Sequence, residues 1–251
     1  MTYKEIIDKA KMICYPAVDS YNGYKTSIDI EASLLLKKYF PHKEIDLMFG
    51  VGPVYKTWPL NNHHFVIPWQ QSNIAPAILR LFDIEFNLND FNKIAYFVQN
   101  NSTQEMYDLS YMVPKEEQRF SITDIETGTT VEQNSLFRDY NDNNCREQYA
   151  TSYYHYFLWC THKCALIRNN SLPDGKSIVI SCDSQMAPVV PVLACYFKEI
   201  LHLDRRKDYD ISKYLEKEYD YVLIAHWSTA GYSIDGIKSK MFINFQHQCE
   251  I

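Results

Sequence analysis

Residues 177 to 225 alternate between apolar, β-branched runs and segments with helical periodicity, which restricts the fold more than any other feature of the chain. The pattern predicts strands at 177–182, 200–204 and 220–225, with helices at 186–197 and 211–218 between them. Strands that alternate with helices pair in parallel through right-handed crossovers. The sequence therefore predicts an α/β fold, a three-layer α/β/α arrangement around a mainly parallel sheet.

Ser184 directly follows the first of these strands, in the sequence Cys182-Asp183-Ser184-Gln185. Ligands of open α/β sheets bind at the carboxyl ends of strands, and the N–H groups of a helix N-terminus can stabilise a developing oxyanion. Ser184 is therefore a candidate nucleophile, and Asp183 and Gln185 are candidates for oxyanion or substrate contacts. The competing interpretation is that Ser184 is only a helix N-cap, because Ser and Asp are favoured there.

Two histidines follow another predicted strand, at 45–51, in the sequence Asn61-Asn62-His63-His64-Phe65. A serine nucleophile needs a base within hydrogen-bond reach, and the loops after two parallel strands open on the same edge of a sheet. His64 is therefore paired with Ser184 as the candidate base. His226 competes with it, since it follows the predicted strand 220–225. His202 lies inside a strand, where a structural role is expected.

The first 170 residues give a less regular pattern. Apolar periodicity predicts helices at 3–14, 27–40 and 70–82 and a strand at 45–51, while composition marks loops at 19–24 and 54–68. Residues 91–98 and 149–167 are compatible with helix or strand. The polar middle, at about 99–148, contains one expected hairpin, with strands at 120–125 and 129–132. We expect a single domain over residues 1–251, in which 99–148 forms an irregular insertion or lobe over the sheet.

The charge and hydropathy of the chain argue against several function classes. The formal charge is −6 with no basic run, which argues against a nucleic-acid groove or an anionic membrane surface as partner. No stretch reaches 18 apolar residues, so no membrane-spanning helix is expected. The first ten residues are charged and amphipathic, unlike a signal peptide, and the chain is expected to be cytoplasmic. The oligomeric state is not indicated.

The seven cysteines, an odd number without the spacing of a disulfide framework, agree with a reducing compartment. The segment Cys160-Thr161-His162-Lys163-Cys164 could ligate zinc through two thiolates and an imidazole. No second Cys/His pair stands nearby at a familiar spacing, and the surrounding sequence is apolar and aromatic. We therefore expect buried thiols, no metal and no cofactor.

Aromatic residues make up 15% of the chain, which includes 20 Tyr. Flat rings can stack on sugar faces while Tyr hydroxyls bond sugar hydroxyls, so carbohydrate contacts are one interpretation. Ordinary core packing is the other, and composition alone favours it.

Two stretches carry a resemblance to a known family. One contains Cys182-Asp183-Ser184-Gln185 and then Leu203-Asp204-Arg205-Arg206; the other contains Val54-Tyr55-Lys56-Thr57 and then Asn62-His63-His64-Phe65. They resemble the DHHW family and its alginate acetyltransferase-like relatives in the SGNH hydrolase superfamily. In that family an apolar strand ends in Asp-Ser, a later strand ends in Asp-x-Arg, and Tyr-Tyr-Lys/Arg-Thr-Asp-His-His-Trp lies upstream.

The resemblance implies an SGNH-like acyl (acetyl) transferase or esterase that uses an acyl donor and a carbohydrate or cell-surface polysaccharide precursor. It implies Ser184 as nucleophile and His64 as general base, with Asn62 at the position of the family's orienting Asp. Asn can hold an imidazole by a hydrogen bond but does not stabilise imidazolium as a carboxylate does. Further oxyanion or substrate candidates are His63, Tyr55, Arg205 and His226.

Two other functions also fit parts of the sequence. Asn62, the Tyr-rich loops, and Phe65 in place of the family's Trp fit a carbohydrate-binding or scaffold protein with a catalytically impaired site. A nucleotide- or sugar-nucleotide-using transferase on a Rossmann-like sheet ranks third, because the turn at 181–186 has no Gly-rich phosphate cradle.

Overall fold

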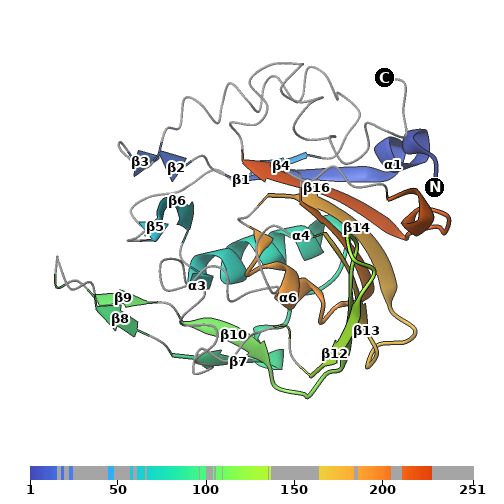
Figure 1. Ribbon diagram of the computed structural model, residues 1–251. Coiled ribbons are helices and arrows are strands. Elements are labelled where there is room, and N and C mark those ends of the chain that lie inside the picture. The colour runs from blue at the N-terminus through green and yellow to red at the C-terminus, as the bar shows by residue number, and fades with distance from the viewer. Residues whose placement is uncertain are drawn as a thin grey trace.

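An eight-stranded sheet forms the centre of the computed structural model, in the order β12-β11-β13-β15-β14-β16-β1-β4 (Figure 1). The α/β class predicted from the sequence is confirmed. The structure describes residues 1–15, 18–19, 23–24, 45–47, 57–58, 61–65, 67–95, 97–99, 104, 106–108, 110–134, 136, 164–183, 186–204 and 211–227. The predicted helix at 27–40 lies outside these residues.

Five neighbouring strands of the sheet run in parallel. They are β15 (Phe197–Asp204), β14 (Lys176–Cys182), β16 (Tyr221–Trp227), β1 (Ala10–Tyr15) and β4 (Ile45–Leu47). The apolar run of β14 explains its central place, because every residue after Lys176 in this strand is buried. The strands predicted at 177–182, 200–204 and 220–225 are thus confirmed, with shifted ends, and the described part of the strand predicted at 45–51 is β4.

The other side of the sheet is antiparallel and consists of β13 (Ala165–Asn169), β11 (Phe120–Asp124) and β12 (Thr130–Gln133). The predicted hairpin is present as β11 and β12, and it extends the edge of the main sheet instead of lying over it. Its turn is held by Asp124, whose carboxylate accepts hydrogen bonds from the N–H groups of Glu126 and Thr127. Gly128 completes the turn at a φ of 71°, a conformation that favours glycine.

Side chains of β14 alternate between two hydrophobic cores, one on each face of the sheet. Ile178 and Ile180 pack in the core that contains α4 (Ala75–Leu81) and α6 (Val190–Leu193), whereas Val179 packs in the core that contains Ile6 of α1 (Tyr3–Lys9). Described helices therefore cover both faces, although they are few and short. The complete three-layer arrangement stays a prediction.

Short paired strands and helical turns complete the described residues. They are β2 (Val18–Asp19) with β3 (Gly23–Tyr24), β5 (Thr57–Trp58) with β6 (Asn61–Phe65), β7 (Phe91–Ile94) with β10 (Tyr111–Pro114), β8 (Phe97–Gln99) with β9 (Met106–Asp108), α3 (Ile67–Trp69), and the turns η1 (Gln70–Ile74), η2 (Leu88–Asp90) and η5 (Ser212–Tyr214). The predicted helix at 70–82 corresponds to η1, a π-helical turn, followed by α4. The expected loop at 54–68 is wrong in part, because β5 and β6 pair within it.

Three predicted helices are shorter than expected. Residues 3–14 form α1 only as far as Lys9, and the rest is β1, whose backbone pairs with both β16 and β4. Residues 186–197 contain the four-residue α6, because Pro191 lies in its first turn and β15 already begins at Phe197. Residues 211–218 contain only η5. Sheet pairing overrides helical periodicity in the first case, and Pro191 with the early start of β15 does so in the second.

None of the helices in the described ranges combines the length and apolar character needed to cross a membrane.

Candidate functional site

The parallel strands place their carboxyl ends at one edge of the sheet, which we call the carboxyl edge. In the register of β14, Cys182 lies opposite Asp204 of β15 on one side and Ala225 of β16 on the other. On the next strand, His226 lies opposite Cys14 of β1. Because ligands of open α/β sheets bind at such an edge, the structure gives these strand ends the place that a catalytic site requires.

Ser184 and Gln185, the candidate nucleophile and its neighbour, lie outside the described residues. The residues on either side of them are described, since Asp183 is buried and the N–H of Met186 donates to the carbonyl oxygen of Asp183 at 3.1 Å. This turn hydrogen bond follows directly after β14. The helix expected from 186 is α-helical only at α6, whereas Met186 itself lies in a 3₁₀ turn.

The crossover after β14 is tied to the rest of the fold by the buried side chain of Gln71. Its Nε2 donates to the carbonyl oxygen of Pro188 at 3.0 Å, and its Oε1 accepts from the N–H of Met112 in β10 at 2.6 Å. The amide thus bridges the crossover and β10 from within η1. Satisfying both backbone groups makes Gln71 a stable part of the buried structure.

The candidate base His64, with Asn62 and His63, lies on β6, while Tyr55 lies outside the described residues. β6 contacts β2, and β2 begins three residues after the end of β1. Figure 1 shows β5 and β6 on the side toward which the arrowheads of β1 and β16 point. The backbone therefore brings this histidine-bearing strand near the carboxyl edge, as a strand pair and not as the expected loop.

The structure describes only one of the other two candidates, His226 and Arg205. His226 is the second-last residue of β16, at the carboxyl edge. Arg205 lies outside the described residues, directly after Asp204, the buried last residue of β15.

Buried polar residues at the carboxyl ends of β14 and β15 were not predicted as a group from the sequence. His202 is 5% exposed inside β15, in agreement with the structural position expected for it, and its Nε2 lies 3.3 Å from the Sγ of Cys182. Asp204 and Asp183 are buried close by in the chain. Strand alternation could have indicated part of this group, because Ile200, His202 and Asp204 must share one face of β15.

Cys164, Cys182 and Cys195 form no disulfide within the described part of the chain; the first two are buried and the third is partly buried. Cys164 is buried and its Sγ accepts a hydrogen bond from the N–H of Asp204 at 3.3 Å, while its two sequence partners for zinc, Cys160 and His162, lie outside the described residues. Burial, with a contribution from the Asp90 carboxylate, raises the pKa of the Cys195 thiol to about 12. This thiol is therefore protonated and unreactive at neutral pH.

Within the part of the chain that the structure describes, no three His, Cys, Asp or Glu side chains come together as a metal site.

The chain matches no known protein-family model and no curated protein sequence. Its fold, however, is similar to that of a DHHW family protein from Eubacterium siraeum, with a TM-score of 0.62 at 15% identity over 93% of this chain and 82% of that one. It is also similar to Bacillus cereus PatB1, with a TM-score of 0.60 at 18% identity over 93% and 87% of the two chains. A structure of PatB1 with a sulfonyl adduct gives a TM-score of 0.61 at 16% identity over 92% and 84%.

These likenesses cover nearly the whole chain. At such low identity they concern the fold, which this chain shares with a DHHW family protein and with PatB1.

Proposed function

We propose that this chain is an SGNH-like, serine-dependent acyl (acetyl) transferase or esterase that acts on a carbohydrate. The observation that carries the proposal is the likeness of fold to a DHHW family protein and PatB1 over 93% of the chain. The sequence adds Ser184, two residues after the last residue of β14, at the edge where ligands of such sheets bind.

In the proposed reaction the Oγ of Ser184 attacks the carbonyl carbon of the acyl donor, and His64 accepts the hydroxyl proton. Backbone N–H groups near Ser184 and Gln185 hold the oxyanion of the tetrahedral intermediate. The donor's leaving group departs with the proton from His64, which leaves an acyl-serine. A sugar hydroxyl or water then attacks this ester, His64 takes its proton, and the Ser184 hydroxyl is restored.

Asn62 is the residue whose chemistry suits this mechanism least. In the proposal it orients the imidazole of His64 through a hydrogen bond, but an amide gives less electrostatic support to imidazolium than a carboxylate. We therefore expect slower turnover than an Asp at this position would give, and Asn62→Asp should raise kcat.

The test is covalent labelling and turnover with an activated acetyl ester. The adduct seen in PatB1 motivates a sulfonyl fluoride as the labelling reagent. We expect labelling of the wild-type chain at Ser184 and loss of both labelling and turnover in Ser184→Ala. His64→Ala and His226→Ala form a matched pair, since both histidines lie on strands near the carboxyl edge. Loss in His226→Ala with wild-type turnover in His64→Ala would reassign the base.

A second function is favoured by Asn62: a carbohydrate-binding or scaffold protein with an impaired catalytic site. It predicts glycan binding without labelling of Ser184 and without ester turnover. A glycan array run beside the sulfonyl fluoride assay separates the two functions.

A further inference from the structure

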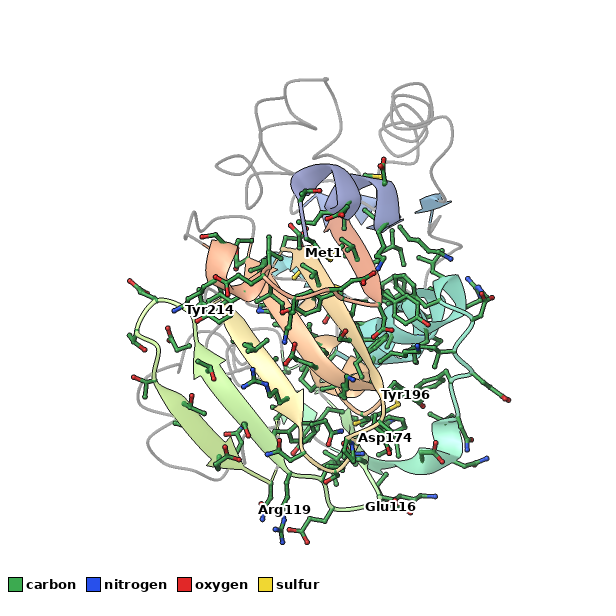
Figure 2. The ribbon with its side chains drawn as sticks, turned by 90° about the vertical axis from the view of Figure 1, so that its right-hand side faces the viewer. Met1, Glu116, Arg119, Asp174, Tyr196 and Tyr214 are labelled. Carbon is green, nitrogen blue, oxygen red and sulfur yellow. The ribbon has the colours of Figure 1, made fainter. Side chains whose placement is uncertain are left out.

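The amino ends of β14 and β15 border a cavity of about 480 Å³, which we call the amino-edge pocket. Its walls come from Asn89–Phe91 on one side, Pro114–Gln118 on a second, and the turns before β14 and β15 on the others. Figure 2 shows this edge of the sheet, with Glu116, Asp174 and Tyr196 grouped together. The volume falls in the range of roughly 300–1,000 Å³ that is usual for small-molecule sites.

This pocket is separate from the carboxyl edge. β14 has seven residues and joins the two edges, which at about 3.3 Å per residue puts them about 20 Å apart. A ligand in the amino-edge pocket therefore does not contact a reacting group at Ser184, and it needs an explanation of its own.

Hydrogen bonds between the walls hold the pocket in a defined shape. The N–H of Lys115 donates to the carbonyl oxygen of Asp90 at 2.8 Å and joins two walls. The buried amide of Asn169 joins two more, since its Nδ2 donates to Gln118 Oε1 and to the carbonyl oxygen of Ala194, each at 2.9 Å. A pocket fixed in this way loses little entropy when a ligand binds.

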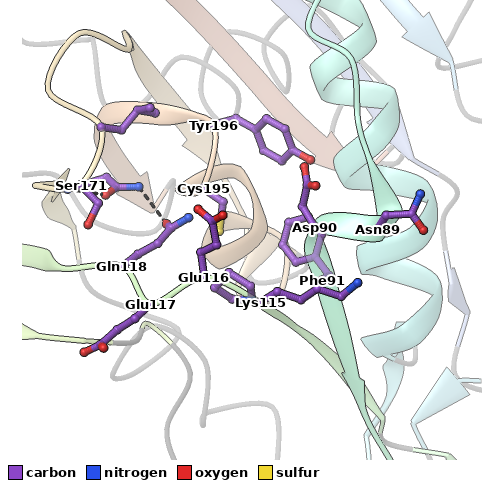
Figure 3. A pocket seen from close by; sticks show the side chains of 13 residues that line it. Asn89, Asp90, Phe91, Lys115, Glu116, Glu117, Gln118, Ser171, Cys195 and Tyr196 are labelled. Atoms are coloured by element: carbon purple, nitrogen blue, oxygen red, sulfur yellow. Dashed lines mark hydrogen bonds between the residues drawn. The ribbon is translucent and has the colours of Figure 1, made fainter.

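Carboxylates and aromatic rings line the pocket together. Phe91 and Tyr196 line it and pack with each other and with Phe86, at ring-centroid distances of 5.7 to 6.3 Å. Figure 3 shows the Asp90 carboxylate pointing toward the Tyr196 hydroxyl and the Glu116 carboxylate directed into the same space, while the Glu117 carboxylate points away. Burial, followed by the Asp90 carboxylate, raises the pKa of Tyr196 against a lowering hydrogen bond from Asn87, so its hydroxyl stays protonated.

The charges of this pocket differ from those of a second cavity nearby, of about 540 Å³. There Glu199 is paired with Arg168 at 2.9 Å and also with Lys217, so the charges satisfy one another. In the amino-edge pocket, no described residue forms an ion pair with Asp90 or Glu116. Asp90 Oδ1 accepts a hydrogen bond from Asn87 Nδ2 at 2.8 Å, and Lys115 is the one cationic side chain among the described residues of the lining, against the carboxylates of Asp90, Glu116 and Glu117. This excess of negative charge favours a cationic ligand, and nearby aromatic faces attract an ammonium group.

We propose that the amino-edge pocket binds an organic ammonium group, of the kind carried by an amino sugar. The ammonium lies between the carboxylates of Asp90 and Glu116, and the ring of the sugar packs on Tyr196. The choice of a sugar as carrier rests on the proposed function, whereas the preference for an ammonium group rests on the pocket alone.

The test measures binding of three compounds by titration calorimetry or ligand-observed NMR: glucosamine, its neutral N-acetylated form, and choline. Binding of glucosamine with much weaker binding of N-acetylglucosamine supports the proposal. Choline then tests whether the sugar ring matters. Choline binding comparable to that of glucosamine supports an ammonium site without sugar preference, and absence of choline binding supports an amino-sugar site. Equal binding of the acetylated sugar, or no glucosamine binding at 10 mM or so, overturns the proposal.

Two isosteric variants locate the site. Glu116→Gln removes a carboxylate that faces the pocket and should weaken glucosamine binding about 5- to 10-fold. Glu85→Gln, its control, removes an exposed carboxylate outside the pocket lining and should leave affinity unchanged. Equal weakening in both, or in neither, overturns the assignment. Binding is also measured in Ser184→Ala, where unchanged affinity keeps the pocket independent of the proposed catalysis.

Discussion

The two edges of the central sheet differ in how far their polar groups are buried and in how these groups are paired. At the carboxyl edge Asp183, His202 and Asp204 are all buried, beside the segment that contains the candidate nucleophile. At the amino edge the charged groups are more exposed and pair across strands, as in the contact of Lys176 with Asp220 at 3.0 Å. Burying titratable groups costs stability, and such groups cluster at functional sites, so their burial agrees with the catalytic role proposed for the carboxyl edge. The amino edge offers charge that a ligand can reach.

Ser184→Ala gives the largest effect expected from this comparison. Removing the nucleophile should lower turnover of an activated acetyl ester at least about 1,000-fold, measured at saturating substrate against the uncatalysed rate. Glucosamine binding at the amino edge should not change. Wild-type turnover in this variant would contradict the assignment of the carboxyl edge as catalytic.

His202→Ala should give the largest stability effect of the single-residue tests. It empties a buried position and removes the 3.3 Å contact with Cys182, and we expect a loss of about 2–4 kcal/mol in the free energy of unfolding. Urea denaturation followed by circular dichroism measures it. Glu216→Gln, at an exposed residue, is the control and should stay within about 0.5 kcal/mol of wild type. A similar small change in His202→Ala would show that the buried polar group at the carboxyl edge is not built as described.

Asp220→Asn tests the amino edge and should cost less, about 1 kcal/mol at pH 7. The Asp220 carboxylate accepts hydrogen bonds from the N–H and Oγ of Ser177, at 2.8 and 3.0 Å, and pairs with Lys176. Partial burial opposes ionisation, but the hydrogen bonds from Ser177 and Lys176 outweigh it, and the pKa of Asp220 is lowered.

The lowered pKa fixes the pH dependence of this contribution. A carboxyl whose pKa is lower in the folded state stabilises the fold above its unfolded pKa of about 3.9 and stops doing so as the pH falls through the lower folded value. The stability difference between wild type and Asp220→Asn should therefore be constant from pH 5 to 8 or so and shrink below about pH 4. A difference that instead grows on acidification would contradict this sign.

Glu218→Gln should have the smallest effect. Glu218 pairs with Lys9 at 3.1 Å, but its side chain is 83% exposed, and solvent screens such a pair. We expect a change of at most about 0.5 kcal/mol in the free energy of unfolding, abolished by 0.5 M salt or so. A larger effect would mean that surface pairs at the amino edge matter as much as the buried group at the other edge.

Much of the sheet could be predicted from the sequence, and the reasons lie in particular runs. β14 is apolar and β-branched at nearly every position, and the turn of the β11–β12 hairpin has Gly128 where a positive φ is needed, so local pattern and tertiary place agree. β1 could not be predicted, because its helical spacing of apolar residues is overridden by pairing on both sides. Its strand character comes from partners that are distant in sequence.

The candidate site was predictable only in its chemistry. The sequence indicates Ser184 and His64, which remain predictions, and the position of His202 inside a strand predicts the structural role that its burial supports. The amino-edge pocket could not be found in this way, because Asp90, Glu116 and Tyr196 belong to three segments that only the fold brings together. Such a site has no local sequence signature.

The Gln71 amide has a consequence for how the proposed reaction would be organised. It holds Pro188 in the crossover between β14 and β15, whose described residues, Asp183 and 186–196, include the four-residue α6. This side-chain tether limits how far the described part of the crossover can rearrange when a substrate arrives. The entropy cost of ordering this backbone is thus incurred during folding. In the proposed reaction, substrate binding would therefore not have to order it again.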